Sequence, residues 1–147
     1  MKYRFQRDVE DALREYPQLL AALETIPEQL IALRDEAEGI RSSASDGVPV
    51  SGGTNRREER LIENVFRRQR LERGLRIAKR RTSAMKKALD TLDERERRVI
   101  DGFYLQRRGD HVEALCSALG YEKSAVYDLK DRALVKLARA LTGLSEG

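Results

Sequence analysis

The feature that most constrains this chain is a short break between two helical patterns near its C-terminal end. Before the break, apolar residues recur at helical spacing at Val112, Leu115, Cys116 and Leu119. After it, they recur along one side at Val126, Leu129, Ala133, Leu137 and Leu141. Gly120 begins the break, and a glycine there suits the left-handed backbone with which many helices end. Because only about three residues separate the patterns, we expect two helices that cross steeply, as in a helix-turn-helix.

A third helix is expected just before this pair. Thr91 and Glu94 have the spacing of a capping box, which predicts a helix from Leu92. Asp110 and Glu113 have the same spacing and predict the start of the next helix. Residues 91–147 are therefore expected to form a domain of three helices.

The outer face of the last helix is the candidate functional surface, because in a helix-turn-helix this face enters the DNA major groove. Its expected residues are Lys123, Ser124, Ala125, Tyr127, Asp128, Lys130 and Arg132. Lys130 and Arg132 can reach phosphates or guanine edges. Ser124 and Tyr127 can hold the DNA backbone. Arg107 and Arg108 complete the candidate DNA-binding residues, and Asp128 and Arg132, four residues apart, predict a surface ion pair.

Three runs in this part of the chain carry a family resemblance, namely LDERERRVIDGFYLQ, VEALCSALG and SAVYDLKDRALVKLARAL. They resemble region four of bacterial sigma factors, which recognises the upstream element of promoters. The resemblance covers roughly the last third of the chain and includes both the core spacing and the position of the glycine. Glu122 departs from the family pattern, which often has a helix-capping serine there. The start of the last helix is therefore left open.

The N-terminal part of the chain resembles a more specific group of proteins. The run VEDALREYPQL, a polar loop and a long basic helix precede the sigma-like end. This order resembles the RinA/ArpU group of phage transcriptional activators. The resemblance implies a protein that switches on phage late genes for packaging, structure or lysis, with double-stranded DNA and bacterial RNA polymerase as its partners.

The first 90 residues are expected to form a helical arm. Helical spacing of apolar residues predicts one helix over residues 5–16, with Pro17 ending it or beginning the next helix. A second pattern follows, and Pro27 inside it predicts a kink or a restart near residues 25–27. Residues 41–55 are rich in serine and glycine, which predicts a flexible loop or linker.

A long helix is expected after this loop, from a cap at Thr54 or Asn55 to about Asp90. Its apolar stripe, with a spacing near 3.5 residues, runs through Leu61, Val65, Leu71, Leu75, Ala78, Met85, Leu89 and Leu92, with Arg68 and Thr82 in two of its places. A coiled-coil-like stripe of this kind needs a partner. The helix of residues 18–38 and a second copy of the chain, which would make a homodimer, are both candidates.

The composition favours an all-α protein. Hydrophobic residues make up 40% and charged residues 37%, which indicates a thin core and a heavily ionised surface. Residues 56–90 carry 13 basic and 5 acidic side chains, whereas residues 1–55 carry 6 basic and 10 acidic ones. The acidic segment can fold against the basic one or leave it for phosphates. In the second case the basic run would add salt-sensitive DNA affinity. This run contains Arg67, Arg68, Arg70, Arg73, Arg76, Lys79, Arg80 and Arg81.

The residue types argue against an enzyme. His111 is the only histidine, and no phosphate-binding glycine loop or nucleophile elbow is present. We therefore expect no cofactor and no metal, with His111 at the surface and Cys116 on the apolar side of its helix. Neither a signal peptide nor an apolar run of membrane-spanning length is seen, so the expected location is the host bacterial cytoplasm, with no membrane partner.

Together these patterns predict a sequence-specific DNA-binding transcriptional activator of phage late genes. It would have a helical arm over residues 1–90 and a helix-turn-helix domain over residues 91–147. Two alternatives stay open. One is an oligomeric DNA-packaging component similar to a small terminase subunit, which the C-terminal place of the helix-turn-helix disfavours. The other is a protein that binds RNA polymerase and not DNA.

Overall fold

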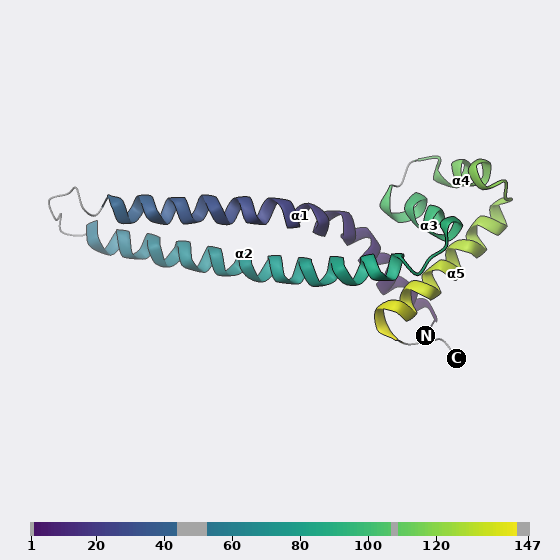
Figure 1. Cartoon of the computed structure of the whole chain (residues 1–147), viewed down its shortest axis with the longest axis horizontal. Coiled ribbons are helices and arrows are strands. Elements are labelled where there is room, and N and C mark those ends of the chain that lie inside the picture. Colours follow the sequence, from purple (N-terminus) through teal and green to yellow (C-terminus); the bar gives the residue numbers. More distant parts are fainter. Residues whose placement is uncertain (1, 44–52, 107–108, 144–147) are drawn as a thin grey trace. The chain divides into compact units, whose positions relative to one another are not determined.

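The structure, a computed structural model, describes residues 2–43, 53–106 and 109–143. The regular elements of these residues are all helical, which confirms the predicted all-α class. They are α1 (Lys2–Ser42), α2 (Gly53–Leu89), α3 (Glu94–Ile100), a π-helical turn (Asp101–Leu105), α4 (His111–Leu119) and α5 (Lys123–Thr142), drawn in Figure 1.

Contacts within the chain divide it into two compact units. The terminal unit comprises Met1–Leu19 and Arg80–Gly147, and the hairpin unit comprises Leu20–Lys79. Helices α1 and α2 therefore contribute to both units. This division differs from the boundary expected after residue 90, because the first turns of α1 and the last turns of α2 pack with α3 and α5.

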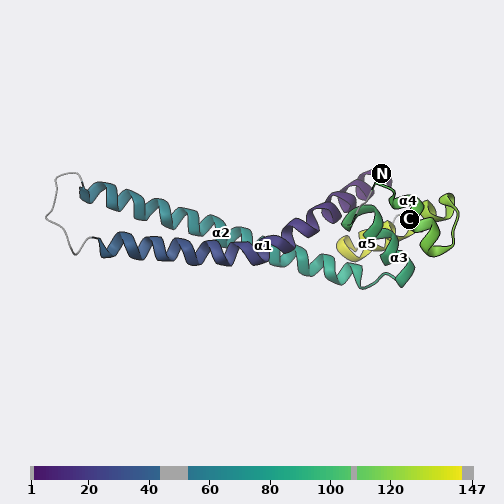
Figure 2. The same cartoon turned by 90° about the horizontal axis from the view of Figure 1, so that it is seen from above.

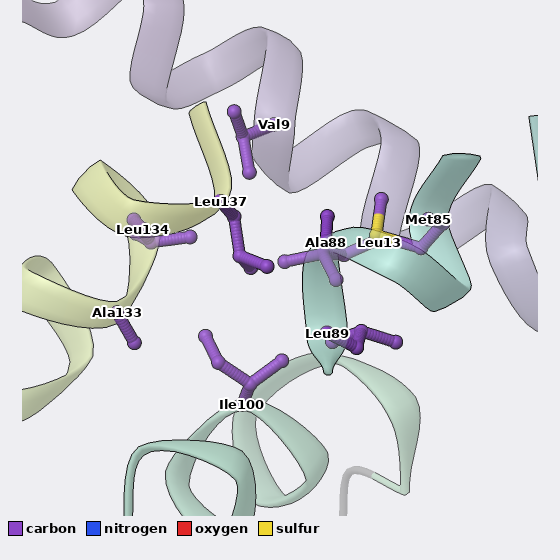
Figure 3. Packing of buried hydrophobic residues seen from close by; sticks show 9 residues of the cluster. All are labelled: Val9, Leu13, Met85, Ala88, Leu89, Ile100, Ala133, Leu134 and Leu137. Carbon is purple, nitrogen blue, oxygen red and sulfur yellow. The ribbon is translucent and has the colours of Figure 1, made fainter. Parts of the chain in front are cut away.

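The core of the terminal unit draws on four helices, because each of them has one apolar stripe to bury. Its buried residues are Val9 and Leu13 of α1, Met85, Ala88 and Leu89 of α2, Ile100 of α3, and Ala133, Leu134 and Leu137 of α5. In Figure 3, Leu137 points from α5 toward Ala88, and Ile100 points from α3 into the same space. This core anchors the inner side of α5.

The hairpin unit consists of α1 and α2 side by side, as both Figure 1 and Figure 2 show. Arg57 donates to the Ser43 carbonyl at 3.2 Å, and Asn64 donates to the Leu33 carbonyl at 2.8 Å. Residue numbers therefore fall along α1 as they rise along α2, so the two helices are antiparallel. Of the two candidate partners for the stripe of α2, the helix of residues 18–38 is the one that covers it in this unit.

Burial along α2 follows the expected stripe except at one position. Val65 is exposed, and Asn64 is buried in its place. A heptad alternates steps of three and four, and Arg68 to Leu71 is a step of three, so the preceding step of four reaches Arg68 from position 64. The Asn64 amide donates to Leu33, and its Oδ1 accepts a bond of 2.8 Å from Arg68 Nε. The prediction of Val65 was wrong because it followed residue type instead of register.

The expected breaks in the arm are not found. Helix α1 is continuous from Lys2 to Ser42, so the expectations that a helix ends or begins at Pro17 and that one restarts near Pro27 are wrong. The alternative of a kink near residues 25–27 stays a prediction. Each proline removes one hydrogen bond from a helix of 41 residues that also packs along its length. The loop was expected over residues 41–55, of which residues 44–52 lie outside the described residues. Of the rest, residues 41–42 and 53–55 are helical and residue 43 is a turn.

Helix α3 begins later than expected. Its N-cap is Asp93, whose carboxylate accepts from the Glu96 backbone at 2.8 Å, while Glu96 accepts from the Asp93 backbone at 2.9 Å. The predicted capping box at Thr91 and Glu94 therefore has the correct spacing but lies two residues before the observed one at Asp93 and Glu96. Asp110 is the N-cap of α4 as expected, but its side chain makes no capping bond.

Candidate nucleic-acid interface

The turn between α4 and α5 has the geometry that the sequence predicted. Gly120 has a φ of +68°, and its N–H donates to the Cys116 carbonyl. The next amide, of Tyr121, reaches the same carbonyl at 3.2 Å. A side chain at this φ would be strained, so glycine is the residue that ends α4 at lowest cost. Residues 120–122 are all that separates the two helices.

A second buried cluster holds these helices together. It contains Val99, Leu115, Val126 and Leu129, with Phe103, Cys116, Leu119 and Tyr121 packed against it. Cys116 is partly buried on the apolar side of α4, as expected. Because the inner side of α5 is occupied by this cluster and by the four-helix core, its opposite side faces outward.

Five of the seven candidate residues on α5 are exposed, namely Lys123, Ser124, Tyr127, Asp128 and Arg132. Steps of three and four connect them over the first turns of the helix, so they lie on one side. We call these five residues the α5 outer face. Ala125 and Lys130 are only partly exposed, and Arg107 and Arg108 lie outside the described residues.

The start of α5 offers backbone donors to a ligand. Its N-cap, Glu122, has an extended backbone and makes no side-chain capping bond. The first amides of a helix have no partner inside it and carry the positive end of the helix dipole. Lys123 and Ser124 are exposed at this same end, so the α5 outer face begins with groups that suit a phosphate.

Lys130 occupies an aromatic site and does not extend into solvent. Its side chain is 16% exposed, and its Nζ lies 5.3 Å from the Phe103 ring centroid and 5.2 Å from that of Tyr127. The two rings meet edge to face, with centroids 5.5 Å apart. A cation is attracted to the negative face of an aromatic ring. Lys130 therefore braces Tyr127, which is 37% exposed, against the π-helical turn.

His111 also packs on this aromatic group. It is the first residue of α4, is partly buried, and its ring lies 4.8 Å from the Phe103 ring at 83°. His111 is therefore less exposed than the surface position predicted for it. Phe103 of the π-helical turn contacts both His111 of α4 and Tyr127 of α5. Helical spacing within one segment cannot predict a contact among three segments.

Two carboxylates, of Asp128 and Asp131, reduce the positive charge on the outward side of α5. Asp131 accepts a bond of 3.4 Å from Gln6 and lies 3.8 Å from Lys130 Nζ. The ion pairs of the described part of α5 join Lys130 to Asp131 and Lys136 to Glu96, so the pair expected between Asp128 and Arg132 is not formed. Arg132 thus keeps an exposed guanidinium, and Asp128 keeps a negative charge beside it.

Arg95 and Tyr121 form a contact near the start of α5 that no sequence pattern predicts. Arg95 of α3 donates to the Tyr121 hydroxyl and also lies over the Tyr121 ring, 5.6 Å from its centroid. Because Tyr121 stands two residues before α5, this pair fixes a guanidinium near the start of that helix. The only signal in the sequence is that Arg95 belongs to a run of arginines, since a contact between residues so far apart cannot be inferred from spacing.

An ion pair between buried Glu96 and half-exposed Lys136 joins α3 to α5. Glu96 is buried, and its Oε1 accepts a bond of 2.7 Å from Lys136 Nζ. The same carboxylate completes the cap of α3. The Glu96 backbone N–H donates to Asp93 and holds the pKa of the Asp93 carboxyl below its usual value of 3.8, with a smaller contribution from the charge of Lys136. The cap of α3 and the middle of α5 therefore depend on one another.

The basic run of α2 is partly engaged with acidic residues of α1. In the hairpin unit, Arg67 lies 3.9 Å from Glu36. In the terminal unit, Arg81 lies 3.7 Å from Glu15. Such exposed pairs contribute little stability. The acidic segment thus does fold against the basic one, while most of the run still faces solvent.

Comparison of the chain with protein-family models, with curated proteins and with solved structures finds no match. Within the described residues, no group of three or more histidine, cysteine, aspartate or glutamate side chains is arranged to hold a metal ion. None of the described helices carries an apolar stretch long enough to cross a bilayer.

Proposed function

We propose that this chain is a sequence-specific DNA-binding transcriptional activator that binds duplex DNA with the α5 outer face. The observation that carries the proposal is the outward position of that face on a helix whose other side is locked into two buried clusters. The short turn at Gly120 supports it, because a helix-turn-helix joins its two helices through a turn of about this length, often with a glycine. The resemblance to sigma region four adds the expectation of a phage late promoter.

The exposed residues take distinct roles in this proposal. Arg132 contacts a phosphate or a guanine edge, because its guanidinium is exposed and not ion-paired to Asp128. Lys123 and Ser124, with the first amides of α5, hold the DNA backbone. Tyr127 adds a backbone contact, and Lys130 acts through it by fixing its ring. Arg95 supplies a further cation near the start of α5.

The test begins with DNA fragments of the genome that encodes this chain, selected by binding to the full-length protein. Affinity for a selected fragment is then compared between Arg132→Ala and Arg139→Ala. Both arginines are exposed on α5, but Arg139 lies two turns further toward its end. Loss of a base or phosphate contact should lower the affinity of R132A by about tenfold, whereas R139A should stay within about twofold.

Thermal unfolding of both variants serves as the control for folding, because neither arginine is buried. Equal affinities for R132A and R139A would remove the α5 outer face from the interface. Selection of no fragment above background would count against sequence-specific binding as such.

A protein that binds RNA polymerase and not DNA is the second candidate. It is favoured by Asp128 and Asp131, which place two carboxylates on the outward side of α5, where they would oppose phosphates. Binding of duplex DNA measured across a salt series separates the two proposals. DNA binding by Lys and Arg weakens steeply with salt, so a salt-dependent shift supports the activator, and its absence supports the second candidate.

A further inference from the structure

An exposed apolar group lies on α2 within the hairpin unit. Ile62 is 56% exposed and Phe66 is 65% exposed, with the exposed Val65 beside them. They lie off the seam, which passes through Leu61 and Asn64. A shallow groove at this place is lined by Glu59, Ile62, Glu63, Phe66, Arg67 and Arg70. Large apolar side chains gathered at the surface indicate a contact surface more often than scattered ones do.

The charges around this group are arranged in order along the helix. Two carboxylates, Glu59 and Glu63, precede Phe66, and two guanidinium groups, Arg67 and Arg70, follow it. Placing a second, antiparallel copy of α2 across a two-fold axis near residue 64 brings opposite charges together. Glu59 then faces the Arg70 of the other copy, and Glu63 faces its Arg67.

The same axis also pairs the apolar residues. Ile62 of each copy meets Phe66 of the other. The two-fold axis therefore forms this apolar contact twice in the dimer. A surface that fits its own copy in this way is the requirement for a closed dimer with a two-fold axis. A nucleic acid would meet Glu59 and Glu63 here, and an unrelated protein would not require the mirrored order of charges.

We propose that residues 59–70 of α2 form a homodimer interface in which two antiparallel copies of the helix pack through Ile62 and Phe66. The ion pairs Glu59 to Arg70 and Glu63 to Arg67 flank this contact and set its register, since a shift by one turn breaks one of them and brings Glu63 or Arg67 against its own counterpart. The interface lies wholly within the hairpin unit. It therefore holds whether or not the α5 outer face binds DNA.

The first experiment measures the dimer dissociation constant of the full-length chain by sedimentation equilibrium. Ile62→Ala is compared with Ile31→Ala, the same substitution at an isoleucine that is 58% exposed on α1 of the same unit. I62A removes apolar contact twice per dimer and should raise the dissociation constant about 30-fold. I31A should leave it within about twofold. A wild-type chain that remains monomeric up to about 100 μM, or equal effects of the two substitutions, overturns the proposal.

The second experiment reverses the charges. Glu59→Arg should weaken the dimer about tenfold, because it places two arginines against each other on both sides of the axis. Arg70→Glu should do the same with two glutamates. The double variant E59R/R70E keeps the net charge and restores opposite charges across the interface, so its dissociation constant should return to within about threefold of wild type. A double variant as weak as the single ones overturns the proposed register.

Folding is checked by circular dichroism, because residues 59, 62 and 70 are exposed and their substitution should leave the helix content unchanged. The result is also separable from the DNA-binding test. Arg132 lies in the terminal unit, so loss of DNA affinity in R132A with an unchanged dimer constant addresses only the proposed function.

Discussion

The two units of this chain bury their apolar residues in different ways. Of the eight largest fully buried side chains in the described residues, seven are apolar and belong to the terminal unit, and the eighth is Asn64 of the hairpin unit. Four helices surround the core of the terminal unit, whereas the seam of the hairpin has one helix on each side. A core enclosed from several directions fixes α5 firmly, while a two-helix seam leaves apolar residues such as Phe66 at the surface.

The largest expected effect compares the same substitution in both units. Leu137→Ala empties a site that four helices enclose and should cost about 4 kcal/mol, because a cavity remains. Leu33→Ala in the hairpin seam should cost about 2 kcal/mol, since two helices can close over the smaller side chain. Hydrogen exchange of the full-length chain, resolved by segment, measures the loss in each unit. Equal losses would mean that the two units are packed alike.

The second prediction concerns the close contact of Gly102 with Leu115. A Cβ at residue 102 would lie 2.9 Å from Leu115 Cδ1 and 3.2 Å from its Cγ. Leu115 is buried, so Gly102→Ala should cost about 2 kcal/mol through overpacking. Gly109→Ala is the matched control, because a Cβ there meets nothing within 4 Å. Urea unfolding of both variants makes the comparison, and a neutral G102A would show that the terminal core is looser than its packing implies.

The third prediction tests the polar residue in the seam. Asn64→Ala removes the bonds to the Leu33 carbonyl and to Arg68 and should cost the hairpin about 1 to 2 kcal/mol. Gln69→Ala, at an exposed site on the same helix, should change stability by less than about 0.5 kcal/mol. Segment-resolved hydrogen exchange should locate the N64A effect in the hairpin unit. An effect spread equally over both units would mean that they unfold together.

The smallest effect depends on pH and belongs to the terminal unit. The pKa of Asp93 is lowered on folding by the bond from the Glu96 backbone. Its ionised form therefore stabilises the folded chain above the usual value of 3.8, and this contribution is lost as the pH falls through the lowered pKa. Asn is also a good cap but does not titrate, so Asp93→Asn should lose less stability than wild type between pH 5 and about 2. Parallel losses in urea unfolding would exclude Asp93 as the titrating group.

Local patterns sufficed for much of the terminal unit. The turn at Gly120, the short link to α5 and the exposure of five candidate residues of α5 were predicted correctly, because each depends on residues that are close in sequence. Lys130 was predicted to contact DNA directly, and that prediction remains untested. Its side chain lies on Phe103 and Tyr127, a contact that arises only when the π-helical turn packs beside α5.

The sequence by itself determined the helical class, the heptad spacing of α2 and the place of the sharp turn, since these follow from periodicity and from the conformational freedom of glycine. Tertiary structure alone decided that α1 and α2 are shared between two units, that Asn64 and not Val65 lies in the seam, and that Glu96 links the cap of α3 to Lys136. The physical reason is that these features depend on which helix faces which. The stripe of α2 could satisfy several partners, and only packing selects α1 and leaves Ile62 and Phe66 outside.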